Sequence, residues 1–335
     1  MKRLHVIFLT LVLCVCTLCL TSCSSEHEHT AGKFISSDGR HRKECLTCGE
    51  VLFSTPCSYQ KTSLGPQGHA TACEVCGHVK KAEEAHEIRQ SVRVTNDEAN
   101  TGEAIFACQE CDYTYTLTAG YVEDFTDPSS LNMLDIQPKE GHFFSKKVED
   151  GVLTMTSQGP IISLNIHPKG ALTNDHQVIV GLTVRAPSMM TSIHWWVNNG
   201  VNTLGFATDK VRLTTLGKFL HINKKVVGEI DDYRFTSIVI YAKLTERPGN
   251  AVMDIRFYVD GVHVGSGSAI VLNRNENKQI GPVSFCDDNT YLQVQRLRDE
   301  YFFPIGGGNY NREVSINIDS IFVADVPADF GELQK

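Results

Sequence analysis

Two consecutive segments rich in histidine and cysteine constrain the fold of this chain more than any other feature. Both follow the pattern [His/Cys]-x11-His-x3-Cys-x2-Cys-Gly. The matching residues are His29, His41, Cys45 and Cys48 in the first segment and Cys57, His69, Cys73 and Cys76 in the second. Self-similarity at a fixed period indicates a repeated structural unit.

The chemistry of the two repeats indicates metal binding. Two thiolates separated by two residues on a tight turn can hold one side of a tetrahedral ion, with the glycine allowing the backbone to turn beneath it. A His or Cys and a second His from the same repeat complete four ligands, so each repeat is predicted to hold one zinc ion. Four protein ligands leave no position for substrate, and the sites are therefore predicted to be structural.

A third, degenerate copy offers three ligands, His86, Cys108 and Cys111, with a longer insertion and Ala104 where the middle histidine would stand. Three states are open for this copy: it binds no metal, it uses Asp112 or His78 as a fourth ligand, or it leaves one coordination position of the ion without a protein ligand. Otherwise His78 is expected to be a solvated surface residue.

Two assignments stay open in the first two repeats. His27 can replace His29, since the two lie close together in the sequence. In a different assignment of ligands, each Cys-x2-Cys pair is completed by the His or Cys that follows it in the sequence. The sequence gaps between ligands are then unequal, and the third copy has no following partner.

Disulfide bonding is the competing interpretation of these cysteines. Twelve cysteines occur in the chain, of which seven lie between positions 45 and 111. An odd number, and histidines recurring in register, favour metal over disulfides. Units this short bury little apolar surface, so metal binding would supply much of their folding free energy, on the order of 10 kcal/mol or more.

The first 23 residues resemble a bacterial lipoprotein signal. Met1-Lys-Arg3 is basic, Leu4–Leu20 is nearly all apolar, and Leu20-Thr-Ser-Cys23 resembles a lipobox. The resemblance implies cleavage after residue 22, lipid on Cys23 and an extracytoplasmic protein anchored to a bacterial membrane. A transmembrane helix is disfavoured, because the apolar run is short and no basic stop-transfer cluster follows it.

From residue 121 onward, short alternating runs bounded by Gly, Asn, Asp and Pro predict strands. The clearest are 152–156, 161–166, 178–184, 235–241, 253–259 and 314–323. They predict a mainly β fold, in which a two-sheet jelly roll pairs its first and last strands. The expected organisation is a signal peptide at 1–22, metal-binding repeats forming a stalk at 23–119 and the jelly roll at 120–335.

Two resemblances accompany these patterns. The repeats are similar to short His/Cys-x-x-Cys-Gly units of surface proteins from gut and anaerobic Gram-positive bacteria. Glu123-Asp-Phe125, Glu149–Leu153, Phe257–Val264 and Ile318–Val323 resemble parts of concanavalin A-like and laminin-G-like jelly rolls. That resemblance implies the fold, which lectins, adhesion domains and glycosidases share.

No catalytic site is predicted. Glu229-Ile-Asp231-Asp-Tyr-Arg234 is similar to the Glu-x-Asp-x-x-Glu motif of laminarinase-type glycosidases, but the second glutamate, which would donate the proton, is missing. Cys286 is expected to be a small buried hydrophobe rather than a nucleophile. We therefore expected a protein that is not an enzyme.

A ligand-binding surface is predicted from aromatic residues. Along a strand one of Trp195 and Trp196 should face outward, where Tyr233, Tyr310, Tyr301 or Phe302 would help it to stack on a sugar ring. Packing of both tryptophans in the interior is the alternative. Acidic pairs at Glu123-Asp124 and Asp287-Asp288 suggest a structural calcium ion.

The function predicted from the sequence is a membrane-anchored protein whose jelly roll binds carbohydrate or a protein ligand. A glycan-active enzyme on the same fold and a structural envelope protein are the alternatives. Hydrophobic residues make up 41% of the chain and charged residues 21%, typical of a folded protein. The net charge of −8 without a dense basic patch gives no support to nucleic acid as a partner.

Overall fold

The structure is a computed structural model of the 335-residue chain. It describes residues 27–127, 134–138, 144–157, 161–185, 191–197, 206–207, 213–216, 219–222, 225–229, 234–247, 250–271, 283–288, 290–297, 314–328 and 330. These residues form strands, turns and connecting segments, and no helix that could cross a membrane occurs among them. Cys23 lies outside the described residues.

The chain divides into two compact units. The first comprises residues 1–60 and 71–82, and the second comprises residues 61–70 and 83–335. The third repeat therefore belongs to the same unit as the C-terminal strands.

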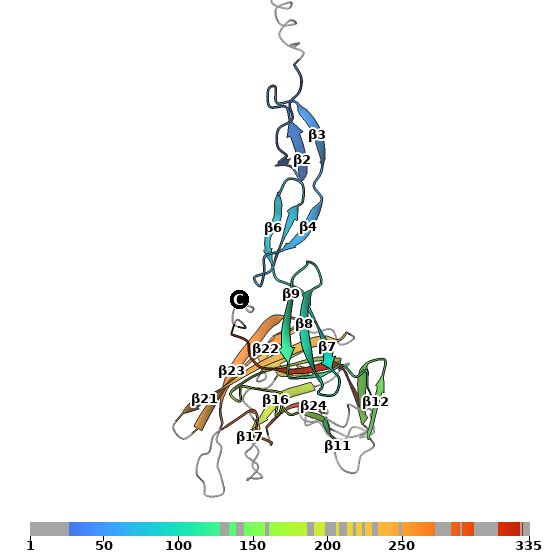
Figure 1. Cartoon of the computed structure of the whole chain (residues 1–335), viewed down its shortest axis with the longest axis vertical. Coiled ribbons are helices and arrows are strands. Elements are labelled where there is room, and N and C mark those ends of the chain that lie inside the picture. The colour runs from blue at the N-terminus through green and yellow to red at the C-terminus, as the bar shows by residue number, and fades with distance from the viewer. Residues whose placement is uncertain are drawn as a thin grey trace, which may run out of the picture. The chain divides into compact units, whose positions relative to one another are not determined.

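Three small antiparallel sheets correspond to the three repeats (Figure 1). They contain β1 (Ile35–Ser37), β2 (Arg40–Glu44) and β3 (Val51–Pro56); β4 (Tyr59–Ser63), β5 (His69–Cys73) and β6 (Val79–Glu84); and β7 (Ile88–Asn96), β8 (Thr101–Cys108) and β9 (Thr114–Ala119).

Two eight-stranded antiparallel sheets form the jelly roll, which confirms the predicted fold. Sheet I has the order β12 (Phe144–Glu149), β13 (Val152–Ser157), β25 (Val314–Ala324), β15 (Gln177–Arg185), β21 (Thr236–Arg247), β22 (Asn250–Val259) and β23 (Val262–Val271), with β10 (Tyr121–Glu123) also paired to β25. Sheet II has the order β11 (Asp135–Pro138), β14 (Ile161–Ile166), β24 (Tyr291–Leu297), β16 (Thr191–Val197), β18 (Leu213–Leu216), β19 (Phe219–Ile222) and β20 (Lys225–Glu229), with β17 (Phe206–Ala207) paired to β16. The pairing of β10 with β25 joins the first and last strands, as predicted.

The central strands of sheet I are buried on both faces. Successive side chains of a strand point to opposite sides, so neighbouring residues enter different cores. In β21, Ile238 and Ile240 enter the core between sheets I and II. Val239, between them, enters a second core on the other face. This explains why Val178–Val184 and Ser237–Tyr241 are nearly continuous apolar runs rather than alternating ones.

The third repeat covers the outer face of sheet I. Ala104 of β8 and Leu117 and Ala119 of β9 pack in the second core together with residues of β15, β21, β22 and β25. Figure 1 shows β7, β8 and β9 beside these strands. The third repeat thus has an apolar core as well as metal-ligating residues.

The predicted Asp-Gly turn between β22 and β23 reaches the third repeat. Asp260 and Gly261 both have positive φ, 49° and 80°, as a tight hairpin turn requires. A Cβ added to Gly261 would lie 2.5 Å from Cβ and Cγ1 of Ile88. Glycine is therefore needed both for the turn and for the close approach to β7.

Replacement of this glycine should loosen the third repeat from sheet I. We expect Gly261→Ala to lower the free energy of unfolding by about 2 to 4 kcal/mol, because positive φ and a steric clash add together. Gly151→Ala is the matched control: Gly151 has φ 71°, but its added Cβ would meet no atom closer than 3.6 Å. It should cost only about 1 to 2 kcal/mol. Equal losses in urea unfolding would show that the contact with Ile88 is unimportant.

Candidate metal centres and an aromatic recess

Each Cys-x2-Cys segment forms the same turn. The N–H of the first cysteine donates to the carbonyl five residues later, in the pairs Cys45–Glu50, Cys73–His78 and Cys108–Tyr113, at 2.8 to 2.9 Å. Gly49 and Gly77, which follow the second cysteine, have φ of 74° and 69°. In the first two turns the glycines thus provide a left-handed residue, as predicted, whereas the third turn has Asp112 at this position without a positive φ.

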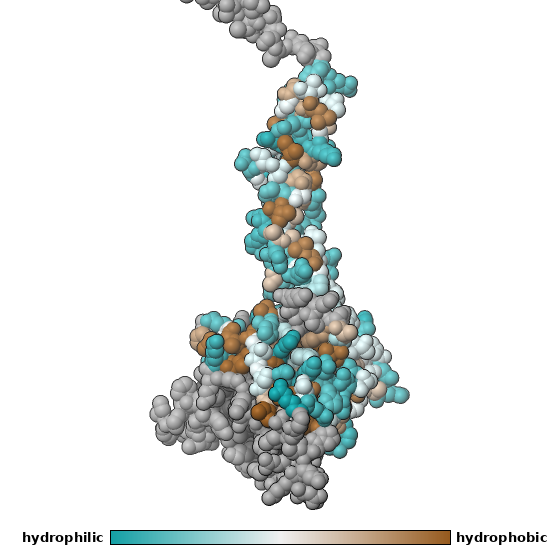
Figure 2. All heavy atoms as spheres, turned by 90° about the vertical axis from the view of Figure 1, so that its left-hand side faces the viewer, coloured by the Kyte–Doolittle hydropathy of each residue, from teal (hydrophilic) through white to brown (hydrophobic). Residues whose placement is uncertain are grey.

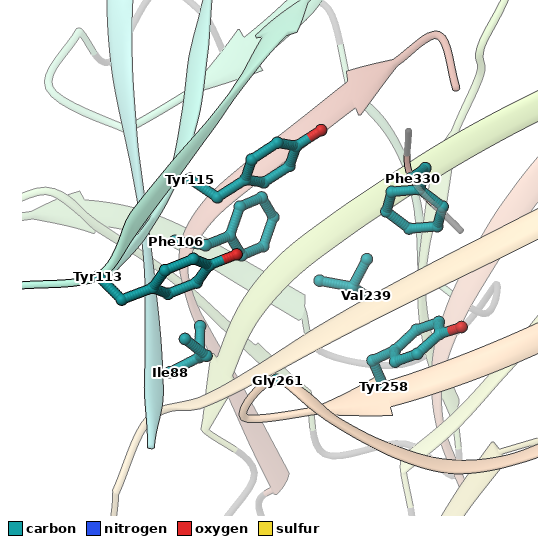
Figure 3. Close-up of a pocket in the computed structure, with 8 residues that line it drawn as sticks. All are labelled: Ile88, Phe106, Tyr113, Tyr115, Val239, Tyr258, Gly261 and Phe330. Atoms are coloured by element: carbon teal, nitrogen blue, oxygen red, sulfur yellow. The ribbon is translucent and has the colours of Figure 1, made fainter. Parts of the chain in front are cut away.

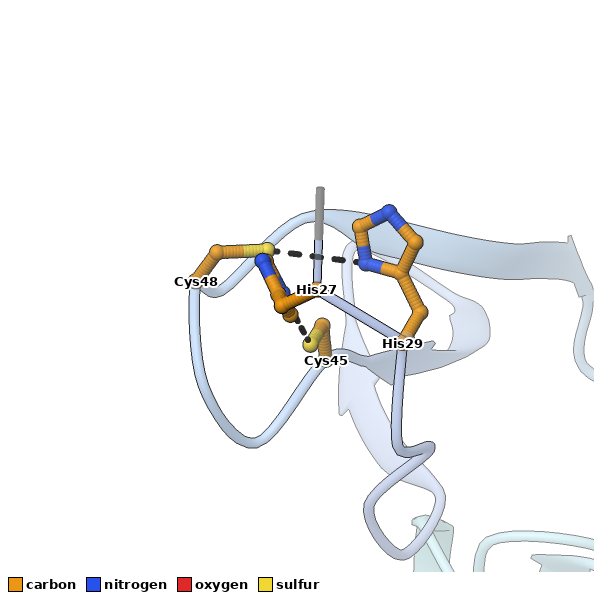
Figure 4. Close-up of side chains that lie close together, drawn as sticks. All are labelled: His27, His29, Cys45 and Cys48. Carbon is orange, nitrogen blue, oxygen red and sulfur yellow. Dashed lines mark hydrogen bonds between the residues drawn. The ribbon is translucent and has the colours of Figure 1, made fainter. Parts of the chain in front are cut away.

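The structure assembles three groups of four nitrogen and sulfur donors. They are His27, His29, Cys45 and Cys48 in site 1; His41, Cys57, Cys73 and Cys76 in site 2; and His69, His86, Cys108 and Cys111 in site 3. Within each group the donor atoms lie within 4.8 Å of one another. Figure 4 shows site 1, with both histidine rings directed toward the two sulfurs.

The distances fit a tetrahedral ion. Ligand bonds of 2.0 to 2.3 Å at tetrahedral angles place two sulfurs about 3.8 Å apart and a sulfur and a nitrogen about 3.5 Å apart. Sγ of Cys57 is 3.8 Å from Sγ of Cys76, and sulfur-to-nitrogen distances run from 3.4 Å in site 1 to 3.8 Å in site 3. A disulfide needs about 2.05 Å between sulfurs, and all eight described cysteines are free.

The predicted grouping of the ligands is wrong for the middle histidines. His41 was assigned to Cys45 and Cys48, and His69 to Cys73 and Cys76. His41 is the second residue of β2 and His69 is the first residue of β5, and the cysteine four residues on lies just after the end of β2 or at the end of β5. An extended strand separates such residues by roughly 13 Å. Each middle histidine therefore belongs to the site of the following repeat.

This shift also completes the first and third sites. Site 1 belongs to the first repeat, which has no repeat before it, and His27 takes the place of the middle histidine. His27 and His29 are therefore both donors rather than alternatives. In site 3, His69 is the fourth donor, where the sequence suggested Asp112 or His78. No repeat follows the third, and its middle position is Ala104, buried in the second core.

Oxygen atoms lie behind four of the histidine rings, and those behind His41 and His86 are at hydrogen-bonding distance. In His29, His41, His69 and His86 the Nδ1 atom faces a cysteine sulfur. The opposite Nε2 atoms face oxygens: Glu50 Oε2 at 3.4 Å, Thr55 Oγ1 at 2.7 Å, Glu110 Oε2 at 3.4 Å and the Gly65 carbonyl at 2.8 Å. A proton on Nε2 leaves Nδ1 free to bind an ion, which is how protein groups around a metal usually fix its histidines.

The electrostatics of the first two turns favour thiolates at Cys45 and Cys73. The backbone N–H of Cys48 is the main cause of the lowered pKa of Cys45, about 5. At Cys73 burial opposes ionisation, but the N–H groups of Cys76 and Val75 outweigh it and lower the pKa to about 6. Burial raises the pKa of Cys57 to about 11. Binding of an ion at site 2 would therefore release a proton from Cys57.

The predicted aromatic surface is not supported where it is described. Trp195 is completely buried, with its ring centroid 5.0 Å from that of Phe285 in the core between the sheets. The prediction that Trp195 contacts a ligand is therefore wrong, because its side of β16 faces the interior. The side chain of Trp196, and Tyr233, Tyr310, Tyr301, Phe302 and Asp231, lie outside the described residues.

A different group of aromatic side chains surrounds a recess at the third repeat. Its lining consists of Ile88, Phe106, Tyr113, Tyr115, Val239, Tyr258, Gly261 and Phe330. In Figure 3 the rings of Tyr113, Phe106 and Tyr115 lie on one side of Val239, and those of Tyr258 and Phe330 lie on the other. The recess is open to solvent, and its cavity volume is about 70 Å³. The sequence analysis did not find it, because its residues come from four separate segments.

The acidic pairs and Cys286, which the sequence analysis also singled out, make other contacts. Glu123 is buried and accepts a hydrogen bond from the Phe125 N–H at 2.8 Å. Asp288 pairs with Lys169. Neither acidic pair joins a group of three or more metal-ligating side chains in the part of the chain that the structure describes. Cys286 is half-buried, and burial raises its pKa.

Comparison with known proteins identifies no sequence family: the chain matches no protein-family model and no curated protein. It resembles solved structures at low identity. An endo-β-1,4-glucuronan lyase from the fungus Trichoderma reesei is 12% identical over 64% of this chain and 98% of its own, with a TM-score of 0.42. The Emp46p carbohydrate recognition domain is 10% identical over 62% and 97%, with a TM-score of 0.36. A Bacillus licheniformis β-glucanase is 9% identical over 62% and 98%, with a TM-score of 0.34.

The prediction that the chain is not an enzyme is corrected by this comparison. The similar structures include glycan-degrading enzymes, namely two laminarinases and an alginate lyase besides the lyase and the glucanase above. The absence of one glutamate from a single motif was therefore too narrow a basis for excluding catalysis.

The ligand grouping can be tested with paired substitutions. His41→Ala with Cys73→Ser removes two donors from site 2 alone, so two of three zinc ions should resist a moderate chelator. His41→Ala with Cys45→Ser damages sites 1 and 2, and one ion should resist. Chromogenic titration of released zinc measures both. If the first variant retained one ion and the second retained two, the grouping predicted from the sequence would be correct.

Proposed function

We propose that this protein is a lipid-anchored, extracytoplasmic protein whose repeats are held by three structural zinc ions and whose jelly roll engages carbohydrate. The observation that supports the metal sites is the small number of buried side chains in the first unit. Among its described residues only His41, Cys45 and Cys73 are buried. All three are donors of the metal sites.

The apolar side chains of the first unit support this role, because they form no core. Ile35, Leu46, Val51, Phe53 and Val79 are all exposed. Figure 2 shows hydrophobic residues of the repeats as separate spots among hydrophilic ones. Without an ion, burial of three donor side chains cannot offset the loss of conformational entropy of about fifty residues.

Zinc is the ion that this donor set suits. Sites 1 and 3 each combine two sulfurs with two imidazole nitrogens, and site 2 combines three sulfurs with one nitrogen. Such sets with tetrahedral spacing are typical of structural zinc, and their four ligands leave no open position for a substrate. Catalysis, where it occurs, would belong to the jelly roll and not to the zinc sites.

The anchor and the ligand class extend this proposal. The basic start, apolar run and lipobox-like Leu20-Thr-Ser-Cys23 support attachment to a bacterial membrane through Cys23. The aromatic recess supports carbohydrate, because aromatic rings offer flat apolar faces on which the C–H face of a sugar ring can pack. Both binding and cleavage of a glycan are compatible with such a domain. Cleavage would release new reducing or unsaturated ends from the glycan, whereas binding alone would not.

Chelation should unfold the first unit and spare the jelly roll. After removal of zinc from the full chain, amides of β2 should exchange with deuterium at the rates of an unfolded peptide. Amides of β15, β21 and β25 should stay protected, because they flank two apolar cores. Zinc should restore protection of β2. Protection of β2 in protein shown by mass spectrometry to contain no metal would contradict the proposal.

Loss of the lipidated cysteine should abolish lipid attachment. We expect Cys23→Ser to incorporate no labelled fatty acid and to keep its uncleaved N-terminal segment, because serine offers no thiol for the lipid on which cleavage depends. Cys286→Ser is the matched control and should incorporate the label and be cleaved like the parent. Incorporation of labelled fatty acid into both variants would rule out Cys23 as the anchor.

A further inference from the structure

The aromatic recess is formed by two structures that the fold brings together. Phe106 of β8 and Tyr115 of β9 are opposite each other in the third repeat, with ring centroids 6.2 Å apart. Tyr258 of β22 and Phe330 belong to the jelly roll, with centroids 6.3 Å apart. A single ring entering between them would have aromatic faces on both sides.

We propose that this recess binds a sugar ring of a neutral glycan, and that the third metal centre holds the wall that the third repeat contributes. The inference rests on the proposed interaction of the jelly roll with carbohydrate and assigns it a site and a ligand class. It places the contact on the outer face of sheet I rather than on the outward-facing tryptophan of β16, where the sequence had suggested it.

The lining supports a neutral sugar rather than a uronate. Its members have no formal charge at neutral pH, and they combine apolar surface with the hydroxyls of Tyr113, Tyr115 and Tyr258. An adjoining depression adds polar groups at the rim, Gln67 and His263, and again no Lys or Arg. A carboxylate sugar would lose its hydration against these rings, which is costly, and the nearby Arg256 is already engaged by the Tyr258 side chain and the Tyr241 ring. A neutral ring can pack its C–H face on the aromatic rings and direct its hydroxyls to the rim.

The metal centre is connected to the recess by two short links. His86, a donor of site 3, stacks on Tyr113 with centroids 4.3 Å apart and planes 7° apart. Tyr113 also follows the Cys108–Cys111 turn directly, and its carbonyl accepts the N–H of Cys108 at 2.9 Å. Ile88, on the same wall, lies two residues after His86. An ion at site 3 therefore fixes both the ring and the backbone of this wall.

Binding to the recess can be tested with the full mature chain and two panels of oligosaccharides. One panel contains neutral fragments of glucans, mannans, galactans and xylans, and the other contains fragments of uronate polymers. Calorimetry should detect binding to a member of the neutral panel, and chromatography of the same mixtures reports cleavage. Tyr115→Ala should weaken the affinity by roughly five- to tenfold, the scale of one aromatic contact.

Two variants keep this test interpretable. Tyr115→Phe retains the ring and should bind within about twofold of the parent, so a loss in Tyr115→Ala that Tyr115→Phe does not share comes from stacking. Phe219→Ala removes an exposed ring on β19 of sheet II and should leave the affinity unchanged. Thermal unfolding of each variant shows whether Tyr115→Ala keeps the fold.

The metal link is tested with a matched pair of histidines. His69 is a buried donor of site 3 and does not line the recess. His69→Ala should therefore weaken glycan binding at least tenfold while every lining side chain is retained. His41→Ala removes the equivalent donor of site 2 and should leave affinity unchanged. Zinc content and protection of β21 amides, measured on both, report the loss of one ion from a folded jelly roll.

The outcomes separate this inference from the proposed function. Binding that survives Tyr115→Ala and His69→Ala, or that is lost in Phe219→Ala, would overturn the recess while the interaction with carbohydrate stands. Preference for the uronate panel would overturn the ligand class. Neither binding nor cleavage of any oligosaccharide by the parent chain would overturn both proposals. Equal losses in His69→Ala and His41→Ala would overturn the link to site 3.

Discussion

The convergence of four nitrogen and sulfur donors at one point is the constraint on which the N-terminal repeats of this structure depend. In a small β unit, folding normally requires apolar side chains that meet in an interior. In the first unit the described interior consists of His41, Cys45 and Cys73, and the larger apolar side chains face solvent. In the function that we propose, coordination of an ion takes the place of a hydrophobic core and stabilises short sheets such as β1–β2–β3, which are marginal in isolation.

The placement of the donors makes each repeat depend on its neighbour. A strand carries its histidine at one end and its first cysteine at the other, so the two cannot share an ion. Site 2 joins His41 of the first repeat to the thiols of the second, and site 3 joins His69 to the thiols of the third. The ends of the series follow the same rule: His27 supplies the missing donor at the beginning, and Ala104 stands where a donor would have no ion to bind.

The sequence predicted the donors and the strands better than it predicted how they combine. The Cys-x2-Cys turns, the Asp260-Gly261 hairpin and the strands of the jelly roll follow from local chemistry, and the structure confirms them. His-x3-Cys spacing is different, because three intervening residues bring the side chains together in a turn but separate them in a strand. Likewise, period-two alternation shows that the two neighbours Trp195 and Trp196 face opposite sides of β16 but not which of them faces the core.

Burial of sheet I on both faces explains why the third repeat differs from the other two. The apolar outer face of β15, β21 and β25 needs a cover, and Leu117, Ala119 and Ala104 provide it. This repeat therefore combines an apolar core with an ion site, and its wall of aromatic residues lies directly beside the Cys108–Cys111 turn. Because the lining of the recess comes from both the repeat and the sandwich, neither part could form it alone. The recess exists only where the third repeat meets a hydrophobic sheet, which is why no local sequence pattern marks it.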